Sequence, residues 1–163
     1  MTGVGDTSPG VGVVRRARPD DLDALVVLCG EHARYERADY RPAGKAIGLA
    51  QALFTPPVRL HAWVVSRDGE LVGYATAAAE FSTWHVREYL HMDCLFVREG
   101  CRGGGLGADL LAAIVAFARR EGFAQVQWQT PAWNTGAMRF YRRAGAVGTS
   151  KRRFSLDLDP ARS

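Results

Sequence analysis

A glycine-rich turn between a predicted strand and a predicted helix is the feature that most constrains how this chain can fold. Residues 97–108 read VREGCRGGGLGA, after an apolar run at 88–97 and before apolar residues that recur at helical spacing as far as Arg120. Glycines let several backbone N–H groups point into one concavity, and the helix that follows adds partial positive charge there. The segment therefore predicts a binding site for an anion such as a phosphate group.

Two common types of phosphate-binding loop do not fit this turn. A phosphate-loop NTPase has Lys and then Ser or Thr after its last glycine, whereas the sequence here continues with Leu106, Gly107 and Ala108. A dinucleotide-binding fold has its glycines after the first strand, and an acidic residue further along the chain binds the ribose. In this sequence the turn follows three consecutive predicted strands, and no such acidic residue is evident. The glycines alone therefore leave the anion unidentified.

The length of 163 residues predicts one domain. Residues 1–12 are expected to form a flexible leader, and the domain is expected to span 13–158. One predicted helix begins at Pro19, and its face with Glu31, His32, Arg34 and Glu36 is expected to be solvated. The remaining helices are predicted at 45–54, after the glycines as far as 120, and at 135–143; strands are predicted at 11–17, 61–66, 70–79, 88–97, 124–130 and, singly or as a pair, 146–156. This order predicts a mixed α/β sheet rather than a regular βαβ alternation.

Composition excludes several classes of protein. With 47% hydrophobic and 23% charged residues, the chain is typical of globular rather than disordered proteins. No apolar run reaches the ~18 residues of a membrane span. The N-terminal residues lack the features of a secretory signal, so a cytoplasmic protein without a membrane partner is expected. Cys29, Cys94 and Cys101 are odd in number and form no C-x-x-C pair, which argues against a disulfide framework and a zinc site.

Charge is unevenly distributed along the chain. Up to Val97 there are 10 Lys or Arg residues against 12 Asp or Glu, whereas from Arg98 onward there are 11 against 5. A basic half is compatible with an anionic cofactor, with nucleic acid or with plain solvated charge. Lys151, Arg152 and Arg153 are the best candidates for nucleic-acid contact, but no basic stripe with interleaved aromatic residues accompanies them. No nucleic-acid partner is therefore expected.

Several segments, in a fixed order, resemble the GNAT family of N-acetyltransferases. The pattern Arg102-x-x-Gly105-x-Gly107 follows a strand that ends in Phe96-Val97, the pair Trp133-Asn134 comes after the next strand, and FYRRAGA at 140–146 lies on the last helix. The resemblance covers roughly residues 60–156 and is strongest to the spermidine/spermine and thialysine N-acetyltransferase branch. It implies a mixed, mostly antiparallel sheet flanked by about four helices, with acetyl-CoA as cosubstrate and no metal.

The resemblance also implies which residues bind acetyl-CoA. Its pyrophosphate would lie on the turn and the start of the helix, at Arg102, Gly103, Gly104, Gly105, Leu106, Gly107 and Ala108. The backbone of Leu95, Phe96 and Val97 would pair with the pantetheine arm as an extra strand. Asn134 would bind this arm or the helix-capping water network, and an ordinary N-cap of the last helix is its alternative role. Arg143, with Arg142 as an alternative, would neutralise CoA phosphate together with Arg102.

Tyr141 is the candidate general acid that the resemblance implies. A phenol with a pKa of ~10 can protonate the departing CoA thiolate, and packing on the core is the alternative role. Asp93 stands where the resembling branch has Glu and is the candidate base, through water, for the amine; a structural carboxylate is the alternative. Strict alternation puts Asp93 on one face with Tyr89, His91, Leu95 and Val97, so His91 is a second candidate.

Acidic residues of the N-terminal half favour a cationic acceptor. They lie in segments that border the acceptor site of the resembling fold: Glu31, Glu36, Asp39, Glu80 and Glu88. A polyamine, a diamine or a lysine-like amino acid is therefore expected. An antibiotic, a protein or peptide amine, and a non-catalytic basic binding module are the alternatives. The branch also implies a homodimer, with Trp128, Trp133 and Phe154 as candidate apolar contacts.

Overall fold

A computed structural model describes residues 11–158 of the chain. Two compact units make up the chain, Met1–Gln129 and Thr130–Ser163. Of the leader expected at 1–12, residues 1–10 lie outside the described residues, and Val11 and Gly12 directly precede the first strand.

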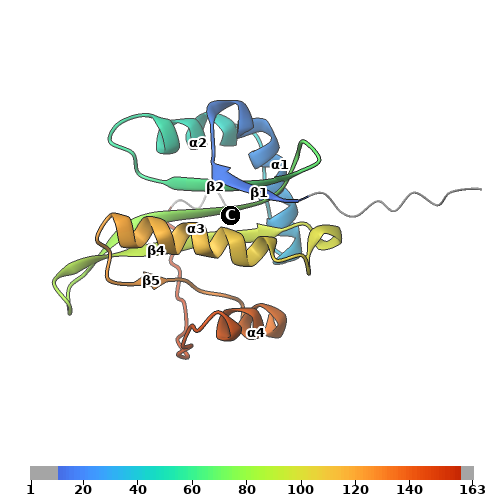
Figure 1. The fold of residues 1–163 in the computed structure, drawn as a ribbon. Helices are drawn as coiled ribbons and strands as arrows, with labels where there is room; N and C mark the ends of the chain where they lie inside the picture. The colour runs from blue at the N-terminus through green and yellow to red at the C-terminus, as the bar shows by residue number, and fades with distance from the viewer. Residues whose placement is uncertain (1–10, 159–163) are drawn as a thin grey trace, which may run out of the picture. The chain divides into compact units, whose positions relative to one another are not determined.

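The first unit is built on one mixed sheet. Its strands follow one another in chain order: β1 (Val13–Arg16), β2 (His61–Arg67), β3 (Glu70–Ser82), β4 (Arg87–Val97) and β5 (Val126–Gln127). Neighbours from β1 to β4 pair antiparallel, whereas β5 runs parallel to β4 (Figure 1). The mixed, mostly antiparallel sheet predicted from the sequence is confirmed.

Four helices lie within the described residues, as predicted. They are α1 (Leu22–Tyr35), α2 (Lys45–Phe54) and α3 (Leu106–Arg120) in the first unit and α4 (Thr135–Arg143) in the second. The short 3₁₀ turns η1 (Pro19–Asp21) and η2 (Glu99–Cys101) precede α1 and α3. Turn chemistry explains two of the boundaries. Asp68 and Gly69 join β2 to β3 with φ angles of 52° and 84°, as tight hairpin turns require, and Pro56 with Pro57 prevents α2 from continuing.

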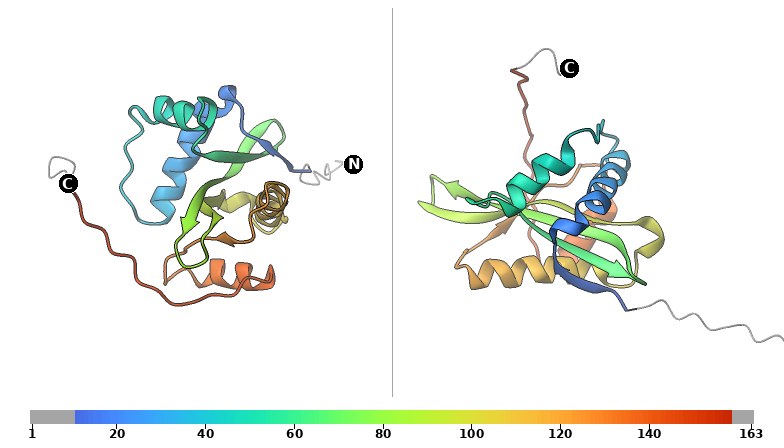
Figure 2. Two further views of the ribbon diagram at one scale, coloured as in Figure 1. Left: turned by 90° about the vertical axis from the view of Figure 1, so that its left-hand side faces the viewer. Right: turned by 90° about the horizontal axis from the view of Figure 1, so that it is seen from above.

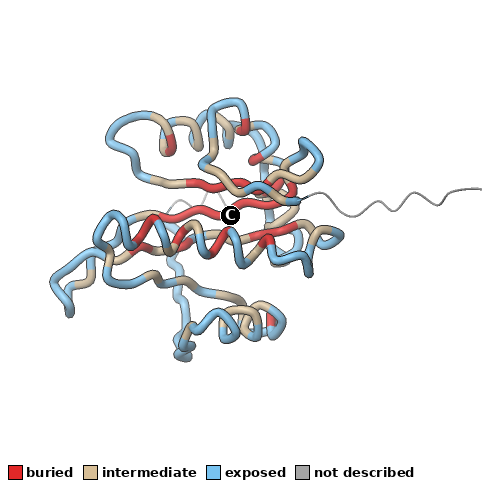
Figure 3. Tube along the Cα trace, viewed as in Figure 1, coloured by how far each residue is buried: buried red, intermediate tan, exposed pale blue. Residues whose placement is uncertain are grey.

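The two faces of the sheet are covered by different helices within the first unit. On one face, Tyr74 and Phe96 pack in a cluster with Leu28 of α1. On the other face, Phe117 of α3 packs edge-on against Trp63, with ring centroids 5.3 Å apart. The views in Figure 2 show α1 and α2 on one side of these strands and α3 on the other, and Figure 3 shows buried positions concentrated along the central strands.

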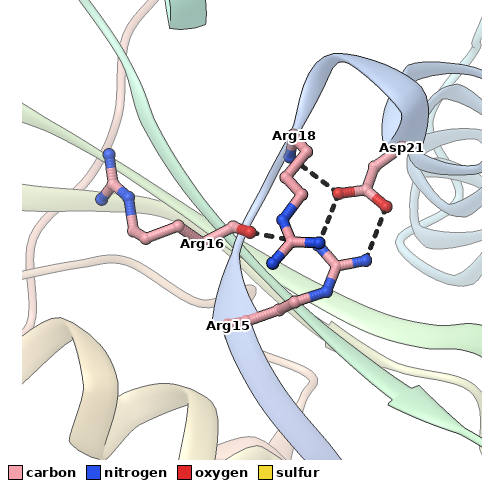
Figure 4. Close-up of polar contacts among 4 residues, drawn as sticks. All are labelled: Arg15, Arg16, Arg18 and Asp21. Atoms are coloured by element: carbon pink, nitrogen blue, oxygen red, sulfur yellow. Dashed lines mark hydrogen bonds and ion pairs between the residues drawn. The ribbon is translucent and has the colours of Figure 1, made fainter.

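A buried carboxylate fixes the start of α1. The Arg15 guanidinium donates two hydrogen bonds to Asp21, at 2.7 and 2.8 Å, and the backbone N–H of Arg18 donates a third at 2.7 Å (Figure 4). Asp21 is only 8% exposed. The bond from Arg15 is the main cause that holds the pKa of Asp21 below its usual value. These contacts tie β1 to the first turn of α1.

In the C-terminal third of the chain one strand prediction is wrong and another is too long. Residues 146–156, predicted as a final strand, contain neither helix nor strand, and Val147, Phe154 and Leu156 are 92%, 89% and 84% exposed. Alternating apolar residues form a strand only when a neighbouring strand takes up their backbone hydrogen bonds, and the second unit has no strand within its described residues. The strand predicted at 124–130 shortens to β5 because pairing with β4 is confined to Leu90 and His91.

Candidate active site

The glycine-rich turn has the backbone conformation that an anion site needs. Gly103 and Gly105 have φ angles of 85° and 83°, left-handed values that favour glycine. Gly105 is also the N-cap of α3 and supplies no side chain to the first N–H groups of that helix. A Cβ atom at either glycine would meet no atom within 4 Å, so both face open space. The turn therefore fits a phosphate-bearing ligand.

Around this turn the side chains hold the backbone in place. Leu106 is buried and anchors the start of α3. The Nε of Arg102 donates a hydrogen bond of 2.8 Å to the carbonyl of Val97, and the Arg102 guanidinium lies 4.5 Å from the ring centroid of Tyr35. Arg102 therefore braces the turn against β4 and α1 through its side chain. Gly104, Gly107 and Ala108 lie at exposed or half-buried positions of the same turn and first helical turn.

One edge of β4 is open next to the turn. β5 pairs with β4 only at Leu90 and His91, so within the described residues no strand adjoins this edge from Met92 to Val97. Leu95, Phe96 and Val97 lie on this open stretch. Unpaired backbone groups on such an edge can bind an extended chain by strand-like hydrogen bonds.

A bulge in β4 corrects the predicted alternation. Thr76 of β3 pairs with Cys94 and the next residue, Ala77, pairs with Met92, so Asp93 is the extra residue of β4. An extra residue shifts the two-residue period by one. The predicted common face therefore breaks at Asp93: Tyr89 and His91 share the face of Cys94 and Phe96, whereas Leu95 and Val97 share the opposite face with Leu90 and Met92.

The bulge also changes the surroundings of Asp93. Asp93 is exposed in the structure, with Oδ2 3.7 Å from the Sγ of Cys94. Burial raises the pKa of the Cys94 thiol to about 12, and the charge of Asp93 adds to this rise. Burial also raises the pKa of the Cys29 thiol. Both thiols therefore stay protonated at neutral pH, and Asp93 is the exposed carboxylate at this point of β4.

His32 of α1 is a polar residue of the site region that the sequence prediction placed on a solvated face. Its side chain is only 12% exposed and stacks on Phe96, with ring centroids 5.0 Å apart. Nδ1 lies 2.9 Å from the hydroxyl of Tyr74, and Nε2 lies 3.3 Å from a carboxylate oxygen of Glu36. Burial lowers the pKa of His32, with the nearby charges of Glu36 and Asp93 opposing the shift. Leu25, Cys29 and His32 have the spacing i, i+4, i+7, which is the signal that could have placed His32 inside.

Glu31, also expected on the solvated face, forms an ion pair beside the turn. Arg98, which directly follows β4, donates hydrogen bonds of 2.8 Å to both oxygens of the Glu31 carboxylate, and it donates a third of 3.1 Å to the carbonyl of Leu71. These bonds connect α1, β3 and the end of β4. The negative charge of Glu31 is thus neutralised within the fold.

The second unit carries the other predicted site residues on and before α4. Asn134 is 8% exposed and caps this helix, because its Oδ1 accepts a hydrogen bond of 3.1 Å from the backbone N–H of Ala137. Asn134 is therefore the N-cap of α4, which is the alternative role predicted for it from the sequence. Tyr141 is half-buried on α4, where its ring lies 5.1 Å from that of Phe140. Arg142 and Arg143 lie exposed in the last turn of the helix.

Residues 11–158 contain no group of three or more His, Cys, Asp or Glu side chains that could hold a metal ion. None of the helices in this part of the chain is long and apolar enough to cross a membrane.

Comparison with known proteins agrees with this geometry. The model of the Acetyltransferase (GNAT) family matches residues 26–146. The thialysine N-epsilon-acetyltransferase of Caenorhabditis elegans is 27% identical over 145 residues, which are 88% of this chain and 89% of that protein. The blasticidin-S acetyltransferase of Streptomyces morookaense is 32% identical over 105 residues, or 64% of this chain and 72% of the relative.

Solved structures have the same fold. An aminoglycoside acetyltransferase from an uncultured soil metagenomic sample superposes with a TM-score of 0.78 over 91% of this chain and 97% of the other, at 18% sequence identity. At this identity the likeness concerns the fold alone.

Proposed function

The chain belongs to the GNAT family of acetyltransferases, and we propose that it transfers an acetyl group directly from acetyl-CoA to the primary amine of a small cationic molecule. The expected acceptors are a polyamine, a diamine or a lysine-like amino acid. The observation that carries the proposal is the uncapped start of α3 after two left-handed glycines, adjacent to the open edge of β4. Acetyl-CoA is the acyl donor that the family implies.

Different residues of the chain bind different parts of the donor. When bound, acetyl-CoA supplies the acetyl group as a reactive thioester. The backbone of Gly103, Gly105 and the first turn of α3 holds its phosphates, because these N–H groups are not capped by a side chain. The open edge at Leu95 to Val97 pairs with the pantetheine arm, and Arg143 adds a positive charge for phosphate.

Asp93 and Tyr141 hold the protons that the transfer requires. An amine with a pKa of ~10 is almost fully protonated at neutral pH and must lose a proton before it can act as a nucleophile. The exposed carboxylate of Asp93 accepts that proton through water. The hydroxyl of Tyr141 holds the proton that the thiolate takes up as it leaves.

Charge near the acceptor segments supports a cationic substrate, although fewer acidic residues contribute than the sequence suggests. Glu31 is paired with Arg98, Glu36 lies against His32, and Glu80 accepts a hydrogen bond from Tyr89. Glu80 keeps its negative charge, because a phenol does not neutralise a carboxylate, and it is exposed, as are Asp39, Glu88 and Asp93. Because they are unneutralised and near β4 or α1, they attract an ammonium group.

An antibiotic amine is the second candidate substrate. It is favoured by the likeness to a blasticidin-S acetyltransferase, which exceeds that to the thialysine enzyme in identity but covers less of the chain. Both candidates use the same donor site and differ only in the acceptor.

We further propose a cytoplasmic homodimer. The three cysteines are free thiols, which supports a reducing compartment. Trp133 and Phe154 are 42% and 89% exposed, so both are available to contribute apolar contact area to a subunit interface.

A thiol-release assay tests the proposed function. Purified protein is incubated with acetyl-CoA and, in turn, diamines, polyamines, lysine analogues, aminoglycosides, blasticidin-S and amine-bearing peptides. Fast CoA release with cationic small amines supports the proposal, with monoamines of the same chain length as matched controls for charge. Release with an antibiotic alone selects the second candidate. CoA release with none of them, together with binding to nucleic acid that weakens steeply with salt, would point to the basic binding module instead.

A further inference from the structure

Arg67, at the end of β2, has an unusual polar environment. Among the buried side-chain nitrogen and oxygen atoms of residues 11–158, only the Nε of Arg67 has no hydrogen-bond partner. Arg67 also takes part in none of the ion pairs of this part of the chain, whereas Arg15 and Arg98 each hold a carboxylate by two bonds. A buried donor left without a partner lowers stability, so this arrangement calls for an explanation.

The position of Arg67 beside the glycine-rich turn supplies an explanation for this unpartnered nitrogen. Its Nη2 lies 3.2 Å from the point that a Cβ atom would occupy at Gly104, so the guanidinium lies against the glycine-rich turn. Gly104 immediately precedes the N-cap of α3. The N-terminus of a helix carries partial positive charge, and a cation next to it is unfavourable unless an anion is bound there as well.

We propose that Arg67 donates hydrogen bonds to a phosphate group of acetyl-CoA bound on the turn, an inference that rests on the proposed use of this donor. Nη2 faces the turn and can donate to a phosphate oxygen, whereas the buried Nε takes part only if the guanidinium turns so that both nitrogens of this edge meet two oxygens of a single phosphate. Arg67 adds a full positive charge to the backbone N–H groups of the turn. Its partner can be the pyrophosphate or the 3′-phosphate of the CoA moiety.

Calorimetric titration with CoA, 3′-dephospho-CoA and pantetheine tests this role without turnover. Arg67→Met keeps the apolar stem and removes the charge, so the Kd for CoA should rise about tenfold or more, while pantetheine binding should not change. An equal loss for 3′-dephospho-CoA assigns Arg67 to the pyrophosphate, and a loss for CoA alone assigns it to the 3′-phosphate. Arg87→Met, at the exposed opposite end of β4, is the matched control for loss of one charge and should bind all three as the wild type does.

Other outcomes would overturn the role of Arg67. CoA affinity within about twofold of the wild type in Arg67→Met, or an equal loss for pantetheine, contradicts it. Absence of CoA binding by the wild type would instead refute the proposed function itself. If Arg67→Met does not fold, Arg67→Lys preserves the charge but not the two-nitrogen edge, and it should bind CoA with intermediate affinity.

Gly104→Ala provides an independent test through the contact itself. The φ of Gly104 is not left-handed, so a methyl group there causes no backbone strain, but it meets Nη2 of Arg67 at 3.2 Å. The substitution should displace the guanidinium and weaken CoA binding in the wild type, and it should have less effect in the Arg67→Met background. Equal losses in the two backgrounds would show that the two positions are not coupled and would contradict the proposal.

Discussion

The Gly105→Ala substitution tests two properties of the turn separately: its backbone strain, through Tm, and its ligand binding, through CoA affinity. Gly105 has a φ of 83°, and its Cβ would meet no atom within 4 Å, so the change affects folding only through strain, at about 1–2 kcal/mol. In a protein of this size each kcal/mol lowers Tm by about 2–4 °C, so Gly105→Ala should melt ~2–8 °C below the wild type. The added methyl projects at the start of α3, where phosphate is expected, so CoA affinity should fall at least ~10-fold, or ~1.4 kcal/mol.

Gly122→Ala is the matched control for this prediction. Gly122 follows the other end of α3 with the same φ of 83°, and a Cβ there also meets no atom within 4 Å. The two variants should therefore show the same decrease in Tm relative to the wild type. Calorimetry should show weaker CoA binding only for Gly105→Ala. Wild-type affinity in Gly105→Ala, or an equal loss of affinity in both variants, would refute the assignment of the phosphate site.

Four further predictions concern catalysis and pH. Tyr141→Phe should lower kcat ~10²–10⁴-fold, while its CoA affinity stays within a few-fold of the wild type. A near-normal kcat in this variant would leave the Tyr141 ring only a packing role. Asp93→Asn should lower kcat most at low pH. Because Arg15 lowers the pKa of Asp21, this carboxylate stabilises the fold above its unfolded pKa of ~3.9, and the contribution is lost as pH falls through the folded value. Asp21→Asn should therefore cost about 1–3 kcal/mol in urea unfolding at neutral pH and flatten the acid dependence, and an unchanged dependence would contradict this. Because burial lowers the pKa of His32, the unfolded state takes up a proton before the folded state as pH falls below ~6.5. The free energy of unfolding therefore decreases in this pH range, and His32→Gln should reduce the decrease. The same pH dependence in both proteins would exclude His32 as the cause.

Local sequence signals were sufficient for elements whose ends are set by a few neighbouring residues. The helix at 45–54 and the helix at 135–143 have the predicted bounds, and the hairpin at Asp68 and Gly69 forms where its turn residues indicate. The glycine-rich turn likewise has left-handed backbone at Gly103 and Gly105, because no other residue type adopts it as readily. In each case the deciding interactions lie within one turn of the chain.

Features that depend on pairing between distant segments could not be predicted. The bulge at Asp93 follows from the register of β4 against β3, which sequence alternation alone does not contain. Alternation predicted a strand at 146–156, but the segment has no neighbouring strand in the described part of the second unit. The approach of Arg67 to Gly104 joins a hairpin to a turn that lies far along the chain. His32 was wrongly predicted to be solvated, because the charged residues beside it in the sequence made the apolar spacing that includes it less apparent.

Titration of isotopically labelled protein with CoA, followed by backbone amide NMR, tests the central claim most directly. The amides of residues 103–108 carry the donors assigned to phosphate, and binding should shift them in a saturable, stoichiometric manner. The amide of Gly122, at the other end of α3, should remain unchanged. Saturable shifts at 103–108 are the result that this account predicts; tight CoA binding that leaves these amides unshifted would contradict it.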